Sequence, residues 1–101
     1  MKRVLTKSAL DEIIKIHQLS RRCNGLRQKK HLAKLLKLMR SHSKEITELY
    51  QKGDLHYLTE VGDLMILCFE LLLENKKSID ATARLCFGRY EKKLTHLLKR
   101  P

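Results

Sequence analysis

Residues 26–53 read LRQKKHLAKLLKLMRSHSKEITELYQKG, and this stretch predicts a long amphipathic helix. On a helical wheel its apolar side chains fall within about 100° of arc, the width that a packed helix buries; they are Leu32, Leu35, Leu36, Met39 and Ile46. Gly53 then stands where a left-handed C-terminal cap is expected. One alternative is that Ser41, His42 and Ser43 divide the stretch into two helices.

Three further helical stretches are predicted around this one. Ser8 is a candidate N-cap for the first, with Asp11 at capping-box spacing, and Asn24-Gly25 ends it. Asp54 is a candidate N-cap for the third, and Ser78 for the fourth. The apolar residues of the fourth recur every three or four positions: Ile79, Ala83, Cys86 or Phe87, Tyr90, Leu94 and Leu97.

These patterns predict an all-α protein. No segment alternates like a strand, no repeat is visible, and the connections are short, which favours antiparallel neighbours. We therefore expect residues 1–101 to form a single domain, an antiparallel up-down bundle of three or four helices. Leu71, Leu72 and Leu73 cannot all point inward in a small monomer, so a homodimer or a protein partner that covers an apolar surface is an alternative.

The positive charge is concentrated in the first half of the chain. The whole sequence has 22 Lys and Arg residues against 11 Asp and Glu, a formal net charge of +11. Residues 21–44 contain no carboxylate. On the wheel Lys30, Lys34, Lys37 and Lys44 lie opposite the apolar stripe with Arg27 beside them, while Lys29 and Arg40 flank the stripe. A phosphate-rich partner would complete such a face. The candidate nucleic-acid-binding residues are Arg21, Arg22, Arg27, Lys29, Lys30, Lys34, Lys37, Arg40 and Lys44.

The acidic residues of the third stretch offer a competing explanation. That stretch has five carboxylates and no basic residue, so it can neutralise part of the second; the five are Asp54, Glu60, Asp63, Glu70 and Glu74. In that case less of the cationic face is available to a partner.

Other functional classes find little support in the sequence. No Gly-rich phosphate loop, metalloprotease motif or nucleophile elbow is present, so we expect no enzyme and no cofactor. The three cysteines are widely spaced, and no Cys or His pair has the short spacing of structural zinc sites, so we expect neither disulfides nor a metal site. No stretch reaches the roughly 20 apolar residues of a membrane span, and no signal peptide is recognisable, which predicts a cytoplasmic protein.

The five aromatic residues lie on or near apolar stripes. We expect Phe69 and Phe87 to pack in the core rather than stack on bases. Recognition of backbone phosphates and of shape is therefore favoured over the reading of base identity.

Part of the basic helix resembles a known family. Residues 28–40, QKKHLAKLLKLMR, are similar to the R-R-R-Q-L-Q-Y-I-G-K-L-M-R motif of the DarP/YjgA family, bacterial helical proteins associated with the large ribosomal subunit. Residues 48–54, ELYQKGD, are similar to a second stretch in some members. The resemblance implies that Lys29, Lys30, Lys37 and Arg40 contact ribosomal RNA.

These observations favour a non-enzymatic protein that docks residues 21–44 on structured RNA, with the ribosome as the expected partner. DNA is the nearest alternative, although the basic helix has few of the Asn, Gln and Arg residues that read bases. A protein-interaction module, such as an adaptor, chaperone or inhibitor acting through an apolar helical surface, is the alternative from a different class. Binding to an anionic membrane surface is less favoured.

Overall fold

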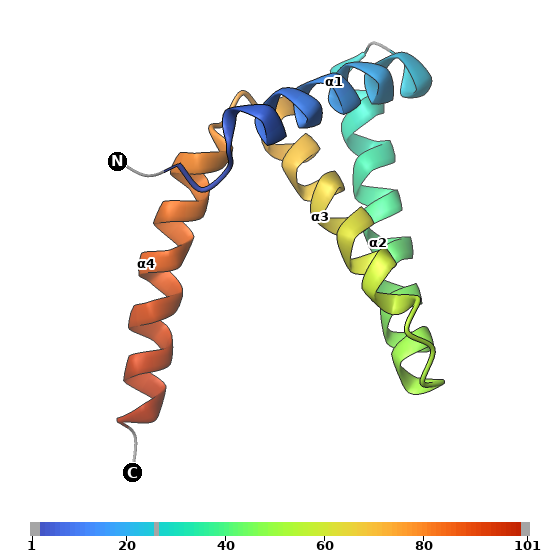
Figure 1. The fold of residues 1–101 in the computed structure, drawn as a ribbon. Coiled ribbons are helices and arrows are strands. Elements are labelled where there is room, and N and C mark those ends of the chain that lie inside the picture. The colour runs from blue at the N-terminus through green and yellow to red at the C-terminus, as the bar shows by residue number, and fades with distance from the viewer. Residues whose placement is uncertain (1–2, 26, 100–101) are drawn as a thin grey trace.

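The computed structural model describes residues 3–25 and 27–99, and the regular elements in these ranges are four α-helices (Figure 1). The all-α prediction is confirmed, and the packing of the helices is consistent with a helical bundle. In chain order the helices are α1 (Lys7–Asn24), α2 (Gln28–Gln51), α3 (Tyr57–Glu74) and α4 (Ile79–Leu98).

Two of the predicted helix boundaries are correct. Gly25 has φ 85° and Gly53 has φ 72°, so each adopts a left-handed conformation that favours glycine. Helix α2 continues without interruption through Ser41 and Ser43. At the start of α4 the Ser78 hydroxyl accepts a hydrogen bond from the Ala81 amide at 3.1 Å, as expected of an N-cap.

Two predicted N-caps are wrong. Helix α1 is capped by Thr6, whose hydroxyl accepts from the Ala9 amide at 3.1 Å, and Ser8 lies inside the first turn. The Asp54 carboxylate accepts from the His56 amide at 2.9 Å, which closes a turn ahead of α3 rather than capping the helix itself. Ser8 and Asp54 both have side chains that can cap a helix, but each helix begins at a different position, after Thr6 and after His56.

Helices α2 and α3 form the packed centre as an antiparallel pair, and α1 lies across one end of it (Figure 1). The Gln28 amide at the start of α2 donates to the Glu74 carbonyl at the end of α3 at 3.1 Å. Leu35 is completely buried between the helices, whereas the next residue, Leu36, is 50% exposed. The buried side of α2 therefore includes His31 and Leu35 and is rotated away from the predicted stripe.

Helix α4 extends away from the α2–α3 pair (Figure 1). Its predicted apolar stripe begins at Ile79, which is buried, but Phe87 and Tyr90 are each 61% exposed and Leu94 is 55% exposed. The prediction that Phe87 packs in the core is therefore wrong, because no neighbouring helix reaches this part of α4. The radius of gyration is 16.1 Å, against about 13 Å for a compact domain of this length.

None of the helices in the described ranges contains a segment that is both long and apolar enough to cross a membrane.

Candidate nucleic-acid interface

The predicted cations lie mainly on the solvent side of α2 and at its start. Leu35 marks the buried side of the helix; Lys29, Lys30, Lys37, Arg40 and Lys44 lie on the opposite side, Arg27 and Lys34 lie on one flank, and Arg22 belongs to the last turn of α1. The exposed members of the predicted set are Arg22, Arg27, Lys29, Lys30, Lys34, Lys37, Arg40 and Lys44. We call these eight residues the α2 basic face.

Almost none of the cations on this face is paired with a carboxylate. Lys44 lies 4.0 Å from Glu48 one turn along the same helix, and both side chains are well exposed. Within residues 3–25 and 27–99, the other seven cations of the α2 basic face form no ion pair. Seven of its eight cations therefore direct an unpaired positive charge toward solvent.

A groove runs along part of this face, at the junction of α1 and α2. It has a volume of about 470 Å³, and its floor and rim come from both helices. Lys30, Lys34 and Lys37 line one side, and Cys23, Asn24 and Gly25 at the end of α1 line the other. Three ammonium groups beside a concave surface are suited to a chain of phosphates.

Arg21, the remaining predicted site residue, is placed differently. Its side chain is 37% exposed, and its Nε lies 3.4 Å from Oε1 of Glu74 on α3. Arg21 therefore faces the junction of α1 and α3 instead of joining the α2 basic face.

The acidic residues of α3 explain why the lysines stay uncovered. Glu60, Glu70 and Glu74 are all buried, with exposed fractions of 8%, 3% and 5%. They lie on one side of α3 and point toward histidines of α1 and α2 rather than toward lysines. The alternative prediction, that the carboxylates of α3 neutralise the cations of α2, is therefore wrong.

At the crossing of α1, α2 and α3, two histidines converge on one carboxylate. Oε1 of Glu74 lies 3.2 Å from Nε2 of His17 and 3.6 Å from Nε2 of His31. The outer nitrogens also have partners, since Nδ1 of His17 lies 3.2 Å from Oε1 of Glu70 and Nδ1 of His31 lies 3.3 Å from the amide of Asn24. His31 is completely buried, and this burial lowers its pKa below the usual 6.5, which favours the neutral imidazole.

A second contact of the same type joins the other half of α2 to α3. Nδ1 of His42 contacts Oε2 of Glu60, and Nε2 of His56 lies 3.5 Å from Oε1 of the same residue. The hydrogen bond from His42 is the main cause that lowers the pKa of Glu60 below its ordinary 4.5. Glu60 thus joins α2 to α3 in its ionised form.

This contact predicts a loss of stability in acid. Because the pKa of Glu60 is lower in the folded than in the unfolded protein, its contribution is present above about pH 4.5 and disappears as the pH falls toward the folded pKa. We expect the unfolding free energy, measured by urea titration, to decrease below pH 4.5 and to do so less steeply in Glu60→Gln. Asp80, whose pKa is lowered mainly by Arg84, maintains part of the decrease in that variant. Equal acid slopes for the two proteins would contradict this role.

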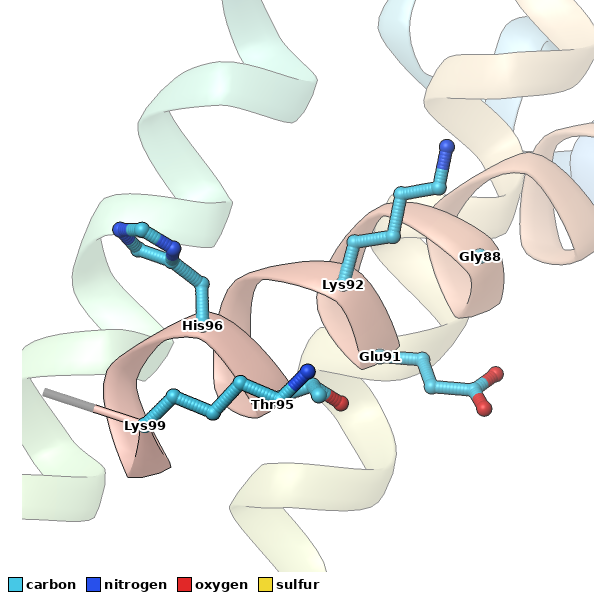
Figure 2. Close-up of a pocket in the computed structure, with 6 residues that line it drawn as sticks. All are labelled: Gly88, Glu91, Lys92, Thr95, His96 and Lys99. Carbon is cyan, nitrogen blue, oxygen red and sulfur yellow. The ribbon is translucent and has the colours of Figure 1, made fainter.

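Helix α4 has a basic depression of its own, similar in volume to the groove at the α1–α2 junction (Figure 2). Lys92, His96 and Lys99 line it together with Gly88, Glu91 and Thr95, all from α4 or its C-cap. Because a single helix supplies the whole lining and Glu91 offsets one positive charge, this surface is a weaker anion site than the α2 basic face.

Sequence reasoning missed the role of the histidines. His17 and His31 are 14 positions apart and belong to different helices, so no short-spacing motif connects them. An available signal was the position of three glutamates in an otherwise apolar stretch of α3, because buried carboxylates require partners.

Comparisons with known proteins found no matching family model, no matching curated protein and no matching solved structure.

Proposed function

We propose that this chain is a non-enzymatic, cytoplasmic RNA-binding protein that docks the α2 basic face on structured RNA. The observation that carries the proposal is the seven exposed cations that form no ion pair in the described ranges: Arg22 at the end of α1, Arg27 at the N-cap of α2, and five residues on α2 itself. A folded scaffold presents these charges, so the protein does not need its partner in order to order them.

The dimensions and chemistry of the face favour phosphate contacts over base contacts. From Lys29 to Lys44 the helix rises about 22 Å, at 1.5 Å per residue. Lysine ammonium groups act as point charges toward phosphates, whereas base reading relies on Arg, Asn and Gln side chains that match base edges. Folded RNA, recognised through backbone and shape, suits this face better than a specific DNA sequence. The similarity of residues 28–40 to ribosome-associated proteins favours ribosomal RNA among the candidates.

A titration with three polyanions tests this proposal. A hairpin-rich RNA, a DNA duplex of equal length and anionic lipid vesicles are each titrated with the protein at the same ionic strength. We expect the RNA to bind most tightly. Tighter binding to the duplex would favour the DNA alternative, tighter binding to vesicles would favour a membrane surface, and no binding to any of the three would contradict a polyanion partner.

A second candidate function, self-association, is favoured by the uncovered stripe of α4. The accessible surface of the chain is 8339 Å², about 2,400 Å² more than expected for a compact monomer of this mass. Two copies that covered this excess would bury about 4,800 Å², within the range of obligate homodimers. The occupant that we propose for the stripe is therefore a second copy of the chain.

Molecular mass in solution tests the second candidate. We expect a dimer by light scattering at micromolar concentration, and a monomer for the double variant Leu94→Glu and Leu97→Glu. Both leucines are about half exposed, so their replacement should leave the helical content measured by circular dichroism unchanged. A wild-type monomer at 100 times that concentration would contradict self-association.

A further inference from the structure

The junction of α1, α2 and α3 has the arrangement of a metal site. Each helix contributes one ligand atom: Nε2 of His17 from α1, Nε2 of His31 from α2 and Oε1 of Glu74 from α3. These atoms all lie within 4.8 Å of one another. Two imidazoles and one carboxylate form a ligand set that zinc uses in proteins.

The two distances from Glu74 to the histidine nitrogens are close to those around a tetrahedral ion. Ligands at about 2.0–2.1 Å from zinc in a tetrahedron lie about 3.3–3.4 Å from each other. The Glu74 oxygen lies 3.2 Å from the His17 nitrogen and 3.6 Å from the His31 nitrogen. Among the described residues, neither Nε2 of His31 nor Oε1 of Glu74 has a hydrogen-bond partner although both atoms are buried, and Nε of Arg21 lies 3.4 Å from the Glu74 oxygen. An ion among the three atoms would satisfy both.

The outer nitrogen of each ring lies beside a group that can orient the ring for a metal, a carboxylate for His17 and a side-chain amide for His31. Nδ1 of His17 lies 3.2 Å from the Glu70 carboxylate, and in the tautomer that donates from Nδ1 the lone pair of Nε2 faces Glu74. A metal ion or a ring proton between these two atoms, 3.2 Å apart, would complete the contact. For His31, rotating the Asn24 amide by 180° lets its oxygen accept from Nδ1–H and from the Ser20 hydroxyl, which frees Nε2 for a metal.

The charge balance of the cluster also leaves room for a cation. Glu70 and Glu74 contribute two negative charges, and Arg21 contributes one positive charge from the partly exposed edge. With neutral histidines the cluster has a net charge of −1, which is costly in a buried position. Either a proton on a histidine or a divalent ion corrects this deficit.

We propose that His17, His31 and Glu74 bind a zinc ion that fixes α1 across the α2–α3 pair. Glu70 and Asn24 act as positioning residues that orient the two imidazoles. The burial of His31 and Glu74 favours a structural role for the ion. Because Asn24 also lines the groove beside Lys30, the ion would hold that end of the α2 basic face in shape. The proposal is independent of RNA binding.

The experiment measures zinc binding to the full chain, purified with chelator and then dialysed. We expect one Zn²⁺ per chain in a competition assay with a chromophoric chelator, and an unfolding temperature raised by at least about 5 °C when Zn²⁺ is in excess. Co²⁺ in place of Zn²⁺ should give the visible absorption of a tetrahedral complex. Absence of stoichiometric binding would overturn the proposal.

Three variants locate the ion. His17→Gln should lower zinc affinity at least 100-fold, and Glu70→Gln, which alters only a positioning residue, should lower it about 10- to 100-fold. His42→Gln is the matched control, since it removes a histidine from the other histidine–glutamate contact and should leave the affinity unchanged. His17 is more exposed than His31, so its variant is better suited to remain folded, which circular dichroism checks. Retained binding in His17→Gln, or its loss in His42→Gln, would overturn the assignment.

Discussion

Replacing Lys30, Lys34 and Lys37 together with glutamate is expected to lower RNA affinity by about 100- to 1,000-fold at 0.1 M salt. All three lysines line the groove at the α1–α2 junction, and no carboxylate in the described ranges is paired with them. Each phosphate contact contributes roughly 0.9 log units of affinity at that salt concentration, so three lost contacts account for a change of this size. Fluorescence anisotropy with labelled RNA measures the change.

The control for this variant has the same net charge on a different surface. Arg89, Lys92 and Lys99 on and just after α4 are exposed, and replacing them with glutamate changes the total charge by an equal amount. We expect this control to lose much less affinity, because its lost charges lie outside the α2 basic face. Equal losses in the two triple variants would mean that total charge, and not the α2 basic face, determines binding. Unchanged affinity in the first variant would contradict the proposed interface.

Replacing Leu35 with alanine is expected to destabilise the protein by about 2–5 kcal/mol, the range for a buried leucine that leaves a cavity. Leu35 is completely buried, and the other buried hydrophobic residues of the described ranges are few: Ile13, Leu67 and Ile79. A domain of this length has a total stability of only about 5–15 kcal/mol. The variant should therefore lose a large fraction of its stability in a urea titration.

Leu36→Ala is the matched control for the core, since it makes the same chemical change at the adjacent position. Leu36 is 50% exposed, so we expect a loss below about 1 kcal/mol. The pair of variants distinguishes the buried side that the structure assigns to α2 from the stripe that the sequence predicts, which includes both leucines. Similar losses for the two variants would contradict the observed orientation of α2.

Local signals in the sequence were sufficient to locate the helices. Gly25 and Gly53 follow the ends of helices because glycine readily adopts the positive φ angle found there. Ser78 begins a helix through a hydrogen bond to the amide of Ala81, three residues later. Both signals depend only on neighbouring residues in the chain. The orientation of α2 was less predictable. Its buried side includes His31, which lies beside Glu74 of α3, and leaves Leu36 half exposed; such contacts between distant residues are not visible in the hydrophobic pattern of one helix.

The cations of the candidate site were predictable because a run without carboxylates on a helix is visible in one dimension. Whether they are covered was not predictable, because the outcome depended on which way the α3 glutamates turn. These glutamates face histidines, so the lysines stay uncovered and only Arg21 leaves the predicted set for the α1–α3 junction. Similarly, the apolar stripe of α4 was correct as a pattern, but the pattern alone does not show whether another helix of the same chain covers it.

The central claim is that an uncovered cationic face of α2 binds phosphates, and the salt dependence of RNA affinity tests it most directly. Affinity is measured from 50 to 400 mM KCl, and the logarithm of the binding constant is plotted against the logarithm of the salt concentration. Six to seven phosphate contacts predict a slope of about −4 to −6, at roughly 0.7–0.9 per contact. A slope shallower than about −1, or no binding at the lowest salt concentration, would contradict the claim.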